Sequence, residues 1–264
     1  MGEVRAKKSL GQHFLADLNI ARKICDALSG GTSRSPAPVL EVGCGTGVLT
    51  RFLLQRSDIV TWGAEIDAES VGYLHAHYPA FAPRLLEGDF LRMDLAALFP
   101  DGVRVIGNFP YNISSQIFFR ILEHRDRVPE CVGMVQREVA VRIACAPGSK
   151  EYGILSVLLQ AWYDIEYLFT VSEKVFDPPP KVKSAVIRLR RNAAVRLACD
   201  EELFVRVVKA SFGQRRKMLR NSLRAVFGGF GGVEHPFFTL RAEQLSVNDF
   251  VALTRWVAEH IGRV

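Results

Sequence analysis

Glycines and carboxylates stand where the sequence predicts successive strands to end. The run Val39-Leu-Glu-Val-Gly-Cys-Gly-Thr-Gly47 places three glycines after a predicted buried strand and before a predicted helix at residues 48–54. Such a turn lets the backbone approach a ligand closely and presents helix N-terminal N–H groups. Glu65 ends the next predicted strand, about 20 residues on, where a carboxylate can accept both hydroxyls of a ribose. This spacing predicts a nucleotide-like ligand, although the glycine turn alone would also suit a plain loop.

A third acid, Asp89 in Glu87-Gly-Asp-Phe90, follows the next predicted strand. Each acid alone would more often be an exposed loop residue, but three strand-end features in the right order favour a cofactor site. A dinucleotide-binding fold requires glycine or alanine at position 48, where this chain has Val48. The pattern that begins at Glu41, E-x-G-x-G-x-G, resembles instead the first motif of class I methyltransferases, which use S-adenosylmethionine. In that type of protein, the acid at the position of Asp89 binds the adenine amine of the cofactor.

The run Asn108-Phe-Pro-Tyr111 ends the fourth predicted strand and suits chemistry on an adenine amine. The N6 lone pair is delocalised into the ring, so this amine is a poor nucleophile. The Asn108 side-chain oxygen and the Pro110 carbonyl can each accept one N–H and localise the lone pair toward a sulfonium methyl. Proline stiffens this turn, and Tyr111 can stack on a base that has been flipped out of its helix. The alternative is an ordinary Asn-x-Pro turn with a core tyrosine.

The elements that must position these residues follow an α/β pattern. Five β-rich runs alternate with helical stretches, which predicts a parallel sheet covered on both faces; the runs are 39–42, 59–64, 84–86, 103–106 and 131–135. Two later runs, 165–171 and 184–189, flank Asp177-Pro-Pro-Pro180 and predict an antiparallel pair at the edge of the sheet. From residue 191 onward the apolar spacing is helical, with a helix start at Ser246-Val-Asn-Asp249 and a glycine-rich stop at 228–232.

The distribution of charge indicates the kind of partner, and the cysteines indicate the compartment. Residues 181–224 hold 13 Lys and Arg against three acids, a net +10 in a chain whose total is +6. Such a concentrated basic load favours a polyanion, with a membrane surface as the weaker alternative. No stretch is apolar and long enough to span a bilayer. Five widely spaced cysteines predict a reducing compartment and no zinc cluster, and His75 with His77 reads as a solvated helix face rather than a metal pair.

Four motifs in the right order resemble the small-subunit ribosomal RNA adenine dimethyltransferases, the KsgA family, over essentially the whole chain. They are Lys8-Ser-Leu-Gly-Gln-His-Phe-Leu15, Asn108-Phe-Pro-Tyr111, Val175-Phe-Asp-Pro-Pro-Pro-Lys-Val-Lys-Ser184 and the run Ser211 to Leu223. The chain departs from the family at Phe109, usually Leu, and at Cys44, where many members have Pro between the glycines.

The resemblance implies a set of site residues. Cofactor contacts fall on His13, Leu15, Gly43, Gly45, Glu65, Asp89 and Asn108. The target base meets Asn108, Pro110, Tyr111 and Phe176, although Phe176 without the resemblance reads equally well as a buried anchor. The RNA contacts expected from the basic segment are Lys181, Lys183, Arg215, Arg216, Lys217 and Arg220.

We therefore expect a class I (Rossmann-like) methyltransferase domain at 1–190 and a small all-helical, RNA-contacting domain at 191–264. The expected enzyme dimethylates two adjacent adenosines in a terminal loop of small-subunit rRNA, using S-adenosylmethionine and no metal. Its partner is the immature small ribosomal subunit in the cytoplasm, with no membrane and no obligate protein partner. Three alternatives stay open: a large-subunit rRNA methyltransferase, an RNA-binding assembly factor without essential catalysis, and, least favoured, a nicotinamide oxidoreductase.

Overall fold

The computed structural model describes residues 4–230 and 232–261. By contacts the chain divides into two units, the first made of the residues up to 140 together with 165–191, the second of 141–164 together with 192 onward. Residues 141–164 thus group with the C-terminal residues, whereas the sequence-based division keeps them in the first domain. The roles expected of the two domains stay predictions.

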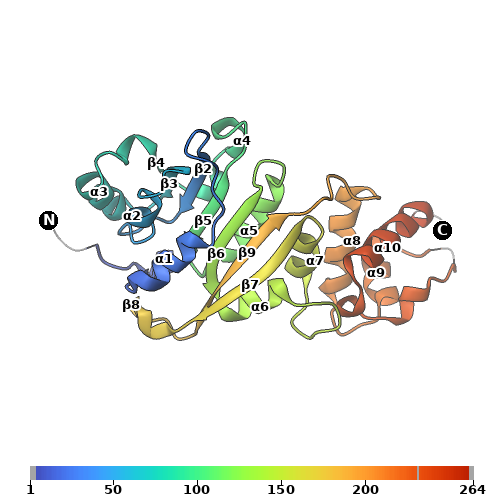
Figure 1. Cartoon of the computed structure of the whole chain (residues 1–264). Coiled ribbons are helices and arrows are strands. Elements are labelled where there is room, and N and C mark those ends of the chain that lie inside the picture. The colour runs from blue at the N-terminus through green and yellow to red at the C-terminus, as the bar shows by residue number, and fades with distance from the viewer. Residues whose placement is uncertain (1–3, 231, 262–264) are drawn as a thin grey trace. The chain divides into compact units, whose positions relative to one another are not determined.

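A seven-stranded sheet with the order β4-β3-β2-β5-β6-β9-β7 organises the first unit (Figure 1). The strands are β2 Ala37–Val42, β3 Ile59–Glu65, β4 Leu85–Glu87, β5 Arg104–Asn108, β6 Glu130–Gln136, β7 Tyr163–Val171 and β9 Ser184–Arg191. The pairs from β4 through β6 are parallel, and β9 runs antiparallel to β6. The five predicted parallel strands are confirmed, as is the position of the last two runs at the edge. Parallel strands put the ends of β2, β3, β4 and β5 on one side of the sheet, where the predicted site residues stand.

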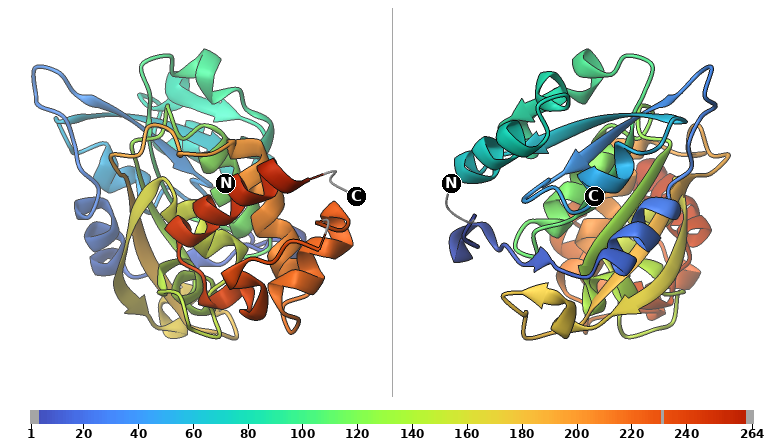
Figure 2. Two further views of the ribbon diagram at one scale, coloured as in Figure 1. Left: turned by 90° about the vertical axis from the view of Figure 1, so that its right-hand side faces the viewer. Right: turned by 60° about the vertical axis from the view of Figure 1, so that its left-hand side comes forward.

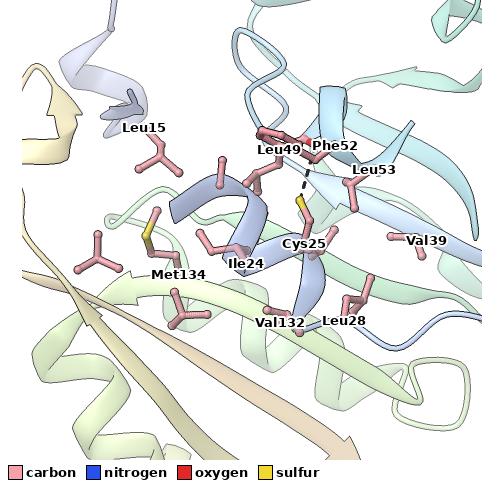
Figure 3. Packing of buried hydrophobic residues seen from close by; sticks show 14 of the residues in the cluster. Leu15, Ile24, Cys25, Leu28, Val39, Leu49, Phe52, Leu53, Val132 and Met134 are labelled. Carbon is pink, nitrogen blue, oxygen red and sulfur yellow. Dashed lines mark hydrogen bonds between the residues drawn. The ribbon is translucent and has the colours of Figure 1, made fainter. Parts of the chain in front are cut away.

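Helix α1 (Leu18–Asp26) covers one face of this sheet. It begins at Asp17, whose carboxylate accepts the N–H groups of Asn19 and Ile20. Ile24 belongs to the same hydrophobic cluster as Val132 and Met134 of β6, and the Cys25 thiol donates to the Leu49 carbonyl at 3.7 Å (Figure 3). The helix thereby fixes the chain that enters it, which is the N-terminal segment of the predicted site.

The remaining helices of the sheet connections have from four to ten residues. They are α2 Thr50–Leu53, α3 Ala68–His77, α4 Leu95–Leu98, α5 Ser114–Glu123 and α6 Arg137–Ala144. Phe109, directly after β5, is buried and meets Phe118 of α5 edge-on, with ring centroids 5.8 Å apart. This anchor holds the turn that carries Asn108 and Pro110.

A separate two-stranded sheet joins the N-terminal segment to the proline-rich loop (Figure 2). Strand β1 (Phe14–Leu15) pairs antiparallel with β8 (Phe176–Asp177), and the Ala16 N–H donates to the Val175 carbonyl at 2.8 Å. The peptide bond Asp177–Pro178 is cis. Two motifs far apart in the sequence are therefore held side by side, which the sequence patterns did not predict.

The second unit is helical, with α7 Ile154–Gln160, α8 Glu201–Gly213, α9 Leu219–Phe227 and α10 Val247–His260. Its centre includes Phe204, which Trp162 meets edge-on at 5.9 Å. The predicted start of α10 is confirmed: Ser246 and Asp249 form a reciprocal capping box. The predicted stop is also confirmed, because Gly228, with φ of 79°, follows the last residue of α9 as its C-cap. No helix among the described residues is long and apolar enough to cross a membrane.

Candidate functional site

One cavity of about 210 Å³ lies over the ends of β2, β3, β4 and β5. Its walls come from the N-terminal segment, the glycine loop and three further strand ends. All seven residues predicted to contact the cofactor line it, namely His13, Leu15, Gly43, Gly45, Glu65, Asp89 and Asn108. The structure thus brings the predicted cofactor residues together, and their roles as ligands stay a prediction.

The glycine loop needs its glycines for conformation and for space. Gly43 and Gly45 have φ of 75° and 54°, in the left-handed region that other residues rarely adopt. A Cβ at Gly45 would also lie 3.0 Å from the Phe14 ring. A side chain at this position would therefore push the N-terminal segment away from the loop.

The Glu65 carboxylate is buried and ties the end of β3 to the glycine loop. Its Oε2 accepts the Gly45 N–H at 2.8 Å, and its Oε1 accepts the N–H groups of Ile66 and Asp67, each at 2.9 Å. Burial raises the pKa of Glu65, and these backbone donors oppose the rise. Three of its roughly four acceptor positions are already used. A ribose with two hydroxyls must therefore share a carboxylate oxygen with a backbone donor.

Glu41 lies behind the glycine loop as a neutral acid. Its side chain is 1 % exposed, and the Thr50 hydroxyl donates to its Oε2 at 2.6 Å. Burial raises the pKa of Glu41 to about 8, so this carboxyl is protonated at neutral pH. It joins the end of β2 to the first turn of α2 without adding charge to the cavity.

The N-terminal segment is fastened by Lys7, a residue that no sequence motif singled out. Its ammonium pairs with Asp67, the buried N-cap of α3, and lies 3.1 Å from Glu69. The hydrogen bond with Asp67 is the main cause that raises the pKa of Lys7. Lys7 and Asp67 are 60 residues apart, and no sequence pattern connects them.

The Asn108 side chain has its orientation set by the N-terminal segment. Its Nδ2 donates to the backbone carbonyl of His13 at 2.9 Å. A carbonyl only accepts, so the amide nitrogen must face His13 and the Oδ1 atom is left as an acceptor. The Pro110 carbonyl accepts the Ile113 N–H at 3.2 Å and keeps a second lone pair. Both residues line the cavity.

Tyr111 is held at its ring and at its hydroxyl. The ring stacks on His13, with centroids 5.4 Å apart, and the hydroxyl lies 2.5 Å from the Ser184 hydroxyl. Phe176, by contrast, is buried away from the cavity. It is 4 % exposed, belongs to the hydrophobic cluster that contains Leu15, and does not line the cavity. Its environment is that of a buried anchor, the alternative interpretation of this residue, and contact with a base stays a prediction.

The residues predicted to bind RNA fall into two groups, those that are exposed and those that are bonded to other residues of the protein. Lys181, Lys183, Arg216 and Lys217 are exposed. The guanidinium of Arg215 instead donates to the backbone carbonyls of Lys150 and Tyr152, and Arg220 pairs with Glu234. Arg215 therefore has a structural task that its sequence position did not indicate. Among the residues that the structure describes, no group of three or more His, Cys, Asp or Glu could hold a metal ion.

The mostly parallel sheet, the glycine loop after β2 and the acids after β3 and β4 define a class I methyltransferase. The family model for ribosomal RNA adenine dimethylase matches residues 3–252. The chain belongs to this family. The family, the fold class and the enzyme class expected from the sequence are thereby confirmed.

Curated relatives match almost end to end. A ribosomal RNA small subunit methyltransferase A from Porphyromonas gingivalis is 58% identical over 96% of this chain and 98% of its own length. One of the same name from Parabacteroides distasonis is 57% identical over 98% and 96%.

Solved structures share the fold at lower identity. A dimethyladenosine transferase from Plasmodium falciparum has a TM-score of 0.78 at 24% identity, covering 94% of this chain and 98% of that one. The 23S rRNA methyltransferase ErmE has a TM-score of 0.64 at 24% identity, covering 92% and 99%.

Proposed function

We propose that this enzyme transfers methyl groups from S-adenosylmethionine to N6 of two adjacent adenosines in a terminal loop of small-subunit rRNA. The substrate is the immature small ribosomal subunit, and the reaction takes place in the cytoplasm without a metal or an obligate protein partner. The names of the relatives above support the small-subunit substrate. The main observation in support of this reaction is the Asn108 amide, whose orientation at the cavity is fixed by a hydrogen bond.

The cavity residues fit the methyl donor. When bound, S-adenosylmethionine supplies an electrophilic methyl group on a sulfonium. Glu65 offers its remaining acceptor position to the ribose, and Asp89 offers a carboxylate whose Oδ1 already accepts the Leu91 N–H at 2.9 Å. Gly43 and Gly45 present no side chain, so that the backbone at these two residues can approach the ligand. A neutral Glu41 keeps a further negative charge away from the donor.

Asn108 and Pro110 activate the adenine amine without a strong base. Each offers one acceptor to an N–H of the amine, which draws the nitrogen toward tetrahedral geometry and localises its lone pair. The hydrogen bond from Nδ2 to His13 prevents the amide from turning its donor toward the amine. Once methylated, N6 is strongly acidic and loses its proton to water. Acceptors that are fixed before the reaction need no reorganisation in the transition state.

Exposed cations hold the RNA by its phosphates. Lys181 and Lys183 in the first unit, and Arg216 and Lys217 in the second, are free to contact solvent-facing anions. Phosphate contacts read the shape of structured RNA more than its sequence. The adenosine itself must leave its stack to reach Asn108, at a cost that a loop nucleotide keeps small.

The test is transfer of tritiated methyl groups to unmethylated small subunits, large subunits and naked rRNA, followed by nuclease mapping. We expect label in two adjacent adenosines of the small subunit. The Asn108→Ala variant should transfer roughly 10²–10³ times more slowly, while Asn248→Ala, which changes a residue of α10 in the second unit, should transfer normally. Label confined to large subunits would refute the substrate, and RNA binding with no transfer would favour an assembly factor.

A further inference from the structure

Ser184 is hydrogen-bonded to Tyr111, a residue of the proposed target-base site. It is the first residue of β9, fully buried, and paired in register with Gln136 of β6. Its hydroxyl lies 2.5 Å from the Tyr111 hydroxyl, and Ser184 does not line the donor cavity. Within residues 4–230 and 232–261, Tyr111 is the hydrogen-bond partner of this hydroxyl. A buried hydroxyl is costly unless it is hydrogen-bonded, so the pair must form together.

The Tyr111 side chain is held at two places, by Ser184 at its hydroxyl and by His13 at one face of its ring. His13 stacks on one face of the ring at an interplanar angle of 28°. His13 is itself fixed, because its Nδ1 donates to the Pro178 carbonyl at 2.8 Å and its own carbonyl accepts from Asn108. With one face covered by His13, only the opposite face of the ring is left to stack on a base.

We propose that Ser184 is a positioning residue for methyl transfer: its hydroxyl holds the Tyr111 ring in the orientation that stacks on the target adenine. The inference rests on the proposed function. The Asn108-Phe-Pro-Tyr111 turn fixes the backbone of Tyr111, but a tyrosine ring still turns about its side-chain torsions. The bond at the far end of the ring removes that freedom. Ser184 touches no reacting atom and acts through the phenol.

The second methyl transfer depends on this orientation more than the first. Unmodified adenine offers two N–H groups, which Asn108 and Pro110 both accept. N6-methyladenine offers one, so one of the two hydrogen bonds that orient the amine is missing. Stacking on Tyr111 must then supply more of the orientation. A ring released from Ser184 should slow the second transfer more than the first, and monomethylated product should accumulate.

The experiment measures both transfers in a single turnover on unmethylated small subunits, by mass spectrometry of the nucleosides. Ser184→Ala removes one hydroxyl of the pair, and Tyr111→Phe removes the other. Each variant should lower the ratio of the second rate constant to the first by about fivefold, the effect of one ordinary hydrogen bond. The double variant should match the single ones, because both changes remove the same interaction. Ser184→Thr, which keeps a hydroxyl, should restore the ratio.

Thr254→Val is the matched control, because it removes a fully buried hydroxyl that donates to the Phe250 carbonyl in α10. It should leave the ratio of rate constants unchanged. Calorimetry should also show unchanged S-adenosylmethionine affinity in Ser184→Ala.

An unchanged ratio in Ser184→Ala, or multiplicative effects in the double variant, would overturn the proposal. Should Ser184→Ala fail to fold, Tyr111→Phe decides by the same ratio. If the wild-type enzyme itself methylates no small-subunit adenosine, the proposed function fails. An enzyme that forms both products at the same ratio with or without the Ser184 hydroxyl refutes the positioning role alone.

Discussion

Asn108 provides the sharpest test of how the amine is activated. Removing its acceptor in Asn108→Ala takes away one of two hydrogen bonds that form as charge develops on N6. The loss of one oxyanion-hole donor costs roughly 2.7–4 kcal/mol, or 10²–10³ in rate. We expect a loss of that size in single-turnover methylation, with little change in RNA affinity. Wild-type rates would show that Asn108 is only a turn residue.

The hydrogen bond to His13 makes Asn108→Asp pH-dependent. An ionised carboxylate would place an oxygen where Nδ2 now lies, 2.9 Å from the His13 carbonyl, and two acceptors at that distance repel. The protonated acid can instead donate to His13 and accept from the amine with its other oxygen. Repulsion favours the neutral form, so the pKa of the introduced carboxyl is raised above its usual value of about 3.9. Activity should therefore be highest below that pKa and fall as the pH rises through it.

The assay is the ratio of variant to wild-type rates between about pH 5.5 and 8.5, since the wild-type amide does not titrate in this range. Asn108→Ala serves as the control, and its ratio should not vary with pH. A ratio for Asn108→Asp that rises with pH would mean that the ionised carboxylate is the better acceptor. The contact with His13 would then not be what orients this side chain.

Four further changes test other residues. Replacing Arg216 and Lys217 by Gln should make the slope of log RNA affinity against log salt concentration shallower by roughly 0.7–0.9 for each phosphate that is no longer neutralised. Arg215→Gln should instead destabilise the fold, because it removes the hydrogen bonds to two backbone carbonyls. Salt titrations of RNA binding and melting curves distinguish the two effects. Glu65→Gln should lower the free energy of unfolding by about 1–3 kcal/mol, because the new amide nitrogen would face a backbone N–H donor. It should also weaken S-adenosylmethionine binding in calorimetry. An unchanged melting temperature would contradict the expected loss of stability. Burial raises the pKa of Glu41 to about 8, whereas its pKa in the unfolded chain is about 4.3. The free energy of unfolding of the wild type should therefore fall by up to about 1.4 kcal/mol per pH unit between roughly pH 5 and 8, and that of Glu41→Gln should not. If denaturant unfolding gives the same pH dependence for both proteins, the assignment is refuted.

Local patterns explain why the strands and the glycine loop were predictable from sequence. The parallel strands are short apolar runs bounded by turn residues, and Gly43 and Gly45 occupy conformations that few other residues tolerate. Right-handed connections between parallel strands limit the strand orders that are possible, and parallel strands end on the same side of the sheet. These rules bring Glu65 and Asp89 to one edge of the sheet without any knowledge of their contacts.

Contacts between distant residues were not predictable in the same way. The hydrogen bond between Tyr111 and Ser184 joins residues 73 apart, and that between His13 and Pro178 joins residues 165 apart. Neither pair leaves a periodic signal. Arg215 shows the converse problem, because its charge fits a phosphate contact while its geometry satisfies two backbone carbonyls. Residue type limits what a side chain can bind, but only its neighbours decide which partner it has.

The N-terminal segment joins the donor cavity to the target-base site physically. Phe14 lies against Gly45 in the glycine loop, while the neighbouring residue His13 orients Asn108 and stacks on Tyr111. Both halves of the site therefore depend on the same stretch of chain, held by β8 on one side and by Lys7 on the other. A segment displaced from the glycine loop would also release the Asn108 amide, because neighbouring residues contact both. Under the proposed function, a change that displaces this segment should therefore weaken donor binding and slow methyl transfer together.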